Sequence, residues 1–111
     1  MKVHETKIGG VAVTALSGRI DSASAAACEA ELARLLQDGR TAMVIDMAEV
    51  DYLSSAGIRA LVMLYKRAVA RDIPLVLART QEHIREILEI AGLTEELPVH
   101  SDIDAALRAV A

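Results

Sequence analysis

The chain has 111 residues, which is typical of one domain, and we expect a single domain over residues 1–111. Hydrophobic residues make up 53% of the chain, which excludes a disordered protein, and only two aromatic residues, Tyr52 and Tyr65, are present. The core must therefore be aliphatic. The net charge of −4, with no basic cluster, argues against a nucleic-acid-binding protein.

The single cysteine, Cys28, excludes a disulfide framework and a zinc site made of several cysteines. It lies in an alanine-rich stretch and is expected to be a small core residue. No apolar run approaches the length of a membrane span, and the first residues do not have the pattern of a signal peptide. We therefore expect a cytoplasmic protein with no membrane insertion.

The first part of the chain predicts a hairpin. Residues 3–7 and 11–16 have the composition of two strands, and the Gly-Gly pair at 9–10 predicts a two-residue turn between them. The two strands are therefore expected to be antiparallel.

A helix is predicted next, with Asp21 or Ser22 as its N-cap and Gly39 as its C-cap. Its buried face is expected to hold four apolar side chains: Cys28, Leu32, Leu35 and Leu36. Residues 42–45 are apolar throughout, as in a strand covered on both faces, and a short loop is expected after Asp46.

The second helix is predicted over residues 55–70 from its apolar periodicity. One helical stripe would be buried, made of Ile58, Leu61, Val62, Tyr65 and Val69.

The last part of the chain predicts two strands and two helices. A strand over residues 74–78 precedes a helix that Thr80 is expected to cap and Gly92 to end. Residues 98–100 predict a short edge strand, and Ser101, with an acidic residue three positions later, is expected to cap the final helix.

The order of elements is therefore β-β-α-β-α-β-α-(β)-α. After an opening hairpin, strands alternate with helices, which calls for right-handed crossovers and parallel pairing. The predicted fold class is α/β, with a mixed, mainly parallel sheet of four to five strands and about four helices.

The candidate functional site lies where the strand over residues 42–45 leads to the second helix. Asp46 ends the predicted strand, and open α/β sheets place their sites at such carboxyl ends. Ser54 and Ser55 open the helix, where free N–H groups and the helix dipole favour negative charge. We expect Ser54 to cap the helix and Ser55 to point outward, so that a phosphate on Ser55 would be tolerated locally yet alter a binding surface.

Three segments, taken in order, resemble the STAS domain family, named for sulfate transporters and anti-sigma factor antagonists. Residues 18–21, Gly-Arg-Ile-Asp, resemble the family's segment before its first helix. Residues 44–46, Val-Ile-Asp, resemble its strand ending in Asp, and residues 50–58, Val-Asp-Tyr-Leu-Ser-Ser-Ala-Gly-Ile, resemble its switch loop and helix start. The resemblance covers nearly the whole chain.

The resemblance implies a stand-alone anti-sigma factor antagonist. In such proteins the unphosphorylated form binds an anti-sigma factor that is also a serine kinase, and the sigma factor is freed. The kinase then phosphorylates a serine two places before the family's glycine, here Ser55, and a serine phosphatase resets the protein. The family's acidic residue before that serine is replaced by Ser54 in this chain. The partner-binding surface implied here is made of Asp46, Asp51, Ser54, Ser55, Gly57 and Ile58.

Two other functions remain open from the sequence. One is a STAS subunit of an ABC transporter for lipids or solutes, which would bind its ATPase constitutively. The other is a ligand-sensing scaffold module. Neither requires phosphorylation of Ser55.

Enzyme classes find no support in the sequence. A hydrolase elbow needs a glycine two residues before the serine, and Leu53 stands there. The three histidines show no metal-ligand spacing, and no glycine-rich phosphate loop occurs. We therefore expect no catalytic residues, no metal and no cofactor.

Overall fold

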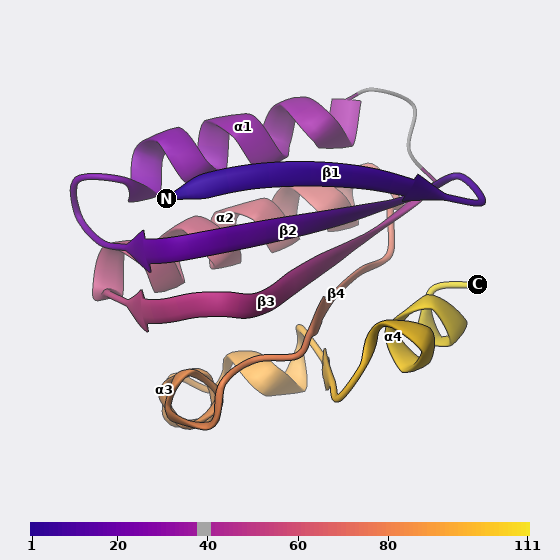
Figure 1. The fold of residues 1–111 in the computed structure, drawn as a ribbon. Helices are drawn as coiled ribbons and strands as arrows, with labels where there is room; N and C mark the ends of the chain where they lie inside the picture. Colours follow the sequence, from indigo (N-terminus) through magenta and orange to yellow (C-terminus); the bar gives the residue numbers. More distant parts are fainter. Residues whose placement is uncertain (38–40) are drawn as a thin grey trace.

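The computed structural model describes residues 1–37 and 41–111. In these residues the strands form one five-stranded sheet in the order β1-β2-β3-β4-β5 (Figure 1). The strands are β1 (Lys2–Ile8), β2 (Val11–Ile20), β3 (Ala42–Leu53), β4 (Leu75–Ala78) and β5 (Val99–His100). The helices are α1 (Ala25–Gln37), α2 (Ser55–Ala70), α3 (Glu82–Ile90) and α4 (Ile103–Ala109), with a 3-10 turn, η1, at Leu93–Glu95.

The pairing confirms the predicted fold class. β1 and β2 are antiparallel, and every other neighbouring pair is parallel. The Gly-Gly turn is also confirmed: Gly9 and Gly10 have φ values of 55° and 84°, and Ile8 pairs with Val11. A two-residue hairpin with positive φ at both central positions is favourable mainly for glycine, which explains this pair.

The middle strands are longer than predicted. β2 continues to Ile20, and β3 runs through the expected loop after Asp46 as far as Leu53. The register between them shifts twice, and each shift places an additional β3 residue opposite β2. These bulges interrupt the period-two alternation by which a half-buried strand is recognised, so the pattern after Asp46 resembled a loop. Gly18, with φ of 93°, lies at one of these bulges, so the sequence after Leu16 also resembled a loop although β2 continues there.

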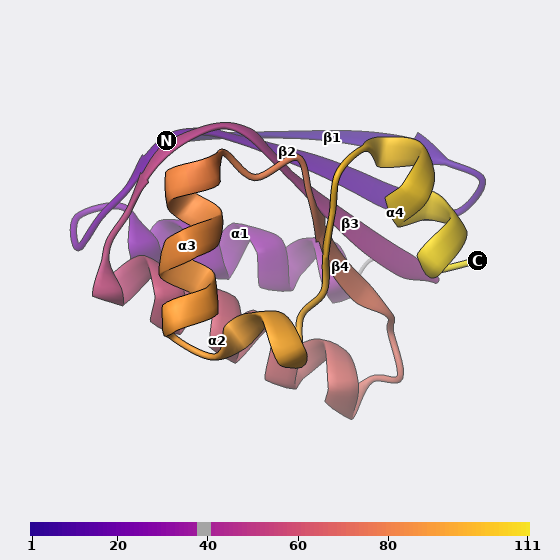
Figure 2. The same cartoon turned by 90° about the horizontal axis from the view of Figure 1, so that it is seen from below.

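Helices cover both faces of the sheet. The larger core cluster joins buried side chains of α1, α2 and α3 to one face, and α1 and α2 run side by side beneath the strands (Figure 2). The smaller cluster packs Ala106 and Val110, at the end of the chain, against Val13, Val44 and Val76 on the other face. Cys28 is buried in the larger cluster, as predicted.

The predicted ends of the helices are confirmed in part. α2 has the predicted bounds, and Gly92, with φ of 75°, follows the end of α3. Asp21 accepts hydrogen bonds from the backbone of the turn before α1, but the regular helix begins only at Ala25. The predicted cap at Gly39 lies outside the described residues.

Two predicted caps are wrong, and the predicted buried stripe of α2 is confirmed in part. Gln81, not Thr80, precedes α3, and Asp102, not Ser101, caps α4 by accepting a 2.7 Å hydrogen bond from the Ala105 backbone N. Leu61 of the predicted stripe is fully buried, and Val69 is 55% exposed. The other three residues of the stripe are half-buried against the core, whereas small residues and leucines make up the fully buried face. That buried face is Gly57, Ala60, Leu61, Leu64 and Ala68.

Within the described residues, none of the helices is both long and apolar enough to cross a bilayer.

Candidate functional site

The turn from β3 into α2 is held by Ser54. Its backbone N donates a 2.9 Å hydrogen bond to the carbonyl oxygen of Ile20, which ties the start of α2 to the end of β2. Its Oγ accepts a 3.2 Å hydrogen bond from the backbone N of Gly57. Ser54 is therefore the N-cap of α2, as predicted, and satisfies one of the free N–H groups of the first turn.

Ser55 is the first residue of α2, and its side chain is exposed. Because Ser54 already supplies the cap, the Ser55 hydroxyl is not needed to hold the helix. Its position confirms the expected division of roles, in which Ser54 stabilises the turn and Ser55 faces outward.

Gly57 allows α2 to approach the sheet closely. A Cβ at this position would lie 2.6 Å from Leu53 Cδ1 and 2.9 Å from the carbonyl oxygen of Ile20. Both distances are shorter than van der Waals contact, so no larger residue fits without movement of the backbone. Gly57 is buried. Ile58, the next residue, is half-buried and packs against the main core.

Asp46 lies within the protein and is 8% exposed. Arg79, just after β4, holds it with two hydrogen bonds, Nε to Oδ1 at 3.1 Å and Nη2 to Oδ2 at 2.5 Å. The Asp46 carboxylate also accepts a 3.1 Å bond from the backbone N of Ala48. Hydrogen bonding to Asp46, reinforced by its charge, raises the pKa of the Arg79 guanidinium. The structure therefore shows Asp46 as one half of a bidentate ion pair.

Side chains that follow β4 also contact the backbone at the edge of β3. β4 pairs with β3 only from Met43 to Asp46, so among the described residues the later part of β3 has no strand on that side. Gln81 Nε2 donates a 3.0 Å bond to the carbonyl oxygen of Ala48, and His83 Nε2 lies 2.9 Å from that of Asp51. The Asp51 side chain itself is exposed.

Sequence reasoning missed Arg79, Gln81 and His83 as part of this site. They follow the carboxyl end of a buried strand, where open α/β sheets place their sites, and that position was the available signal. Arg79 also has a φ of 58°, an uncommon conformation for arginine, and its backbone N donates to the carbonyl oxygen of His100 at 2.9 Å.

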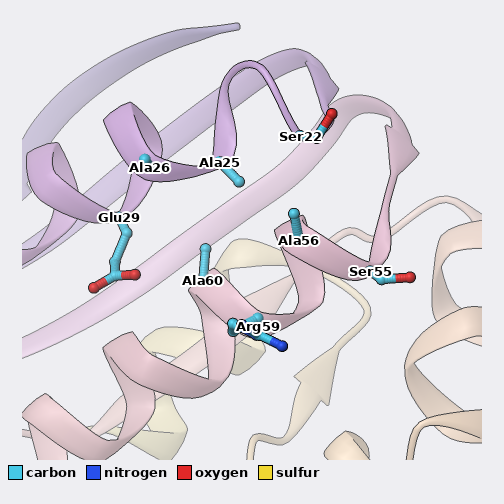
Figure 3. Close-up of a pocket in the computed structure, with 8 residues that line it drawn as sticks. All are labelled: Ser22, Ala25, Ala26, Glu29, Ser55, Ala56, Arg59 and Ala60. Carbon is cyan, nitrogen blue, oxygen red and sulfur yellow. The ribbon is translucent and has the colours of Figure 1, made fainter.

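A hollow of about 420 Å³ lies between the first turns of α1 and α2 (Figure 3). Half of its lining residues are alanines, and the others are two serines, one acid and one arginine. The lining residues are Ser22, Ala25, Ala26, Glu29, Ser55, Ala56, Arg59 and Ala60. Of the predicted site residues only Ser55 lines this hollow, whereas Asp46 and Asp51 do not. In the described part of the chain, no three His, Cys, Asp or Glu side chains gather to form a metal site.

The structure is an α/β domain with a five-stranded mixed sheet, and Ser54 caps α2 directly before the exposed Ser55. Residues 3–106 match the family model for the STAS domain, and the chain belongs to this family.

Among its relatives, BtrV of Bordetella bronchiseptica, whose name describes it as a candidate anti-sigma factor antagonist, is 37% identical over 109 residues. That match covers 98% of this chain and 94% of BtrV. The anti-sigma-F factor antagonist RsfB of Mycobacterium tuberculosis is 29% identical, over 91% of this chain and 82% of RsfB. The crystal structure of an anti-sigma factor antagonist from Mycobacterium paratuberculosis superposes with a TM-score of 0.89 at 28% identity. It covers 98% of this chain and 92% of the solved chain.

Proposed function

We propose that this protein is an anti-sigma factor antagonist, a regulatory binding protein with no enzymatic activity. Its partner would be an anti-sigma factor that is also a serine kinase, and binding would free the sigma factor in the cytoplasm. Full-length similarity to antagonists such as BtrV and RsfB supports this class of function. The observation that carries the proposal is that Ser55 is exposed at the start of α2, while Ser54, not Ser55, caps the helix.

The docking surface would be centred on that helix start. Ser55 and Asp51 offer exposed side chains, and Ser54 and Ile58 are half-buried beside them. Gly57 and Asp46 would support this surface without touching the partner. Gly57 allows α2 to lie close to the sheet, and Asp46 holds the segment after β4 through Arg79.

Phosphorylation of Ser55 would end the complex. The kinase would transfer the γ-phosphoryl group of ATP to Ser55 Oγ, with loss of the hydroxyl proton and formation of ADP. The added charge of about −1.5 to −2 would have to be desolvated at the interface, which costs several kcal/mol unless it is paired. Since about 1.4 kcal/mol changes affinity tenfold, the complex would dissociate without any unfolding. A serine phosphatase would hydrolyse the phosphoester and restore binding.

The test is a pull-down from the native organism with four baits: the parent protein, Ser55→Ala, Ser55→Glu and the matched control Ser101→Glu, which adds the same charge at an exposed serine outside this surface. We expect a serine-kinase-type anti-sigma factor on the parent, Ser55→Ala and Ser101→Glu, and its loss on Ser55→Glu. Equal recovery on all four baits would overturn the switch.

Two other outcomes would replace the proposal. Recovery of an ABC transporter ATPase on every bait would assign the protein to a transport complex. A melting temperature raised by a small molecule, with no protein captured, would assign it to ligand sensing.

A further inference from the structure

The hollow beside Ser55 contains one arginine whose charge is not used by the fold. Of the eight lining residues, Glu29 and Arg59 carry charge. Glu29 is engaged by Arg67 of α2 at 3.5 Å. Arg59 is exposed and makes no ion pair or hydrogen bond within the part of the chain that the structure describes.

Arg59 stands four residues after Ser55 on the same helix, with Glu29 on the facing helix α1 (Figure 3). Residues four apart are neighbours on a helix surface. Long helical side chains lean toward the N-terminus of their helix, so the exposed Arg59 side chain can reach the turn that carries Ser55 by rotation. An anion placed N-terminal to a cation at this spacing is the more favourable of the two orders.

The start of α2 has fewer free donors for a phosphate than an uncapped helix would have. The backbone N of Gly57, which would otherwise face an anion there, already donates to Ser54 Oγ. A phosphoryl group offers three acceptor oxygens, and guanidinium binds phosphate with several donors at once. Among the lining residues, Arg59 is the cation within one helical turn of Ser55.

We propose that Arg59 is the intramolecular receptor for a phosphoryl group on Ser55. This inference rests on the proposed phosphorylation of Ser55 and adds a second part to it. Phosphorylation then changes the surface twice, since it introduces negative charge and neutralises Arg59, the cation among the described residues that line the hollow. An acidic group of a partner that would meet Arg59 in the unphosphorylated protein meets a neutralised arginine afterwards.

The test places phosphoserine at position 55 by site-specific incorporation, so that no kinase is needed, and follows the phosphorus resonance by NMR as pH is varied. The parent phosphoprotein is compared with Arg59→Gln and with Arg71→Gln. Arg71 follows the last turn of α2, so its replacement makes the same change in net charge far from Ser55.

We expect the ratio of phosphate dianion to monoanion, at one pH near 6, to be about twofold higher in the parent than in Arg59→Gln, from the usual strength of such a pair. The Arg71→Gln phosphoprotein should match the parent, and high salt should reduce the difference. Equal titration of all three proteins would overturn the inference, and so would equal changes in both variants. Neither result depends on a partner, so failure here is distinct from failure of the Ser55 pull-down.

Discussion

Gly57→Ala tests how closely α2 packs against the sheet. A methyl group at this position would lie 2.6 Å from Leu53 Cδ1, 3.0 Å from Ile20 Cγ2 and 2.9 Å from the carbonyl oxygen of Ile20. The Leu53 side chain can rotate, but that carbonyl oxygen is fixed because it accepts the 2.9 Å bond from the backbone N of Ser54. To make room, α2 must therefore move away from the end of β2.

Two opposing contributions determine how much Gly57→Ala changes the free energy of unfolding. Overpacking in a well-packed core costs about 1–3 kcal/mol. Replacing glycine by alanine within a helix gains about 1 kcal/mol in propensity, and less in the first turn. Because the clash involves backbone, we expect the clash to win, with a net loss of about 1–2 kcal/mol in the free energy of unfolding. In a domain of this size that corresponds to a melting temperature lowered by about 5–10 °C.

The assay is equilibrium urea unfolding of the purified protein, followed by circular dichroism. Ser55→Ala is the matched control, since it adds no clash and alters an exposed residue of the same turn, and it should unfold within about 0.5 kcal/mol of the parent. A Gly57→Ala protein as stable as the parent, or more stable, would refute the close packing described for this turn.

Three further predictions concern the same region and the core. Ser54→Ala should lower the free energy of unfolding by about 1 kcal/mol, measured in urea, because Gly57 loses its capping acceptor. Asp46→Asn should lower it by about 1–3 kcal/mol, since the charged bidentate pair with Arg79 is lost. An unchanged urea midpoint in either variant would contradict the contact concerned. Burial raises the pKa of the Cys28 thiol to about 11, so alkylation at pH 8 should be slow in the folded protein and fast in urea. An unfolded thiol ionises at lower pH than the buried Cys28 thiol, so the contribution of Cys28 to stability should decline from pH 9 toward 11. Rapid alkylation of the folded protein at pH 8 would contradict the burial of Cys28.

The architecture could be predicted because its main signals are local. The Gly-Gly turn, the apolar run that begins β3 and the periodicity of α2 each depend on a few adjacent residues, and all three are confirmed. The later part of β3 could not be predicted in this way. Its pairing with β2 includes two register shifts, and these depend on a partner strand that is distant in sequence.

In the candidate site, too, features set by adjacent residues could be predicted and contacts between distant residues could not. The roles of Ser54 and Ser55 followed from helix capping, which is a local effect, and the capping is confirmed. The environment of Asp46 did not, because its partner Arg79 is 33 residues away. The predicted stripe of α2 lay one position away from the fully buried face, because apolar residues occur on both sides of Leu61 and the sequence does not show which side meets the sheet.

The two serines divide stability from regulation at one helix start. Ser54 is bonded to Ile20 through its backbone N and to Gly57 through its side chain, so a change of this side chain lowers stability. Ser55 is exposed one residue later, so a phosphate there would leave both of those bonds in place. In the proposed mechanism the phosphorylated protein therefore keeps its structure and differs at its surface alone. Stability measurements on the phosphoprotein should then show little change, while partner binding falls by orders of magnitude.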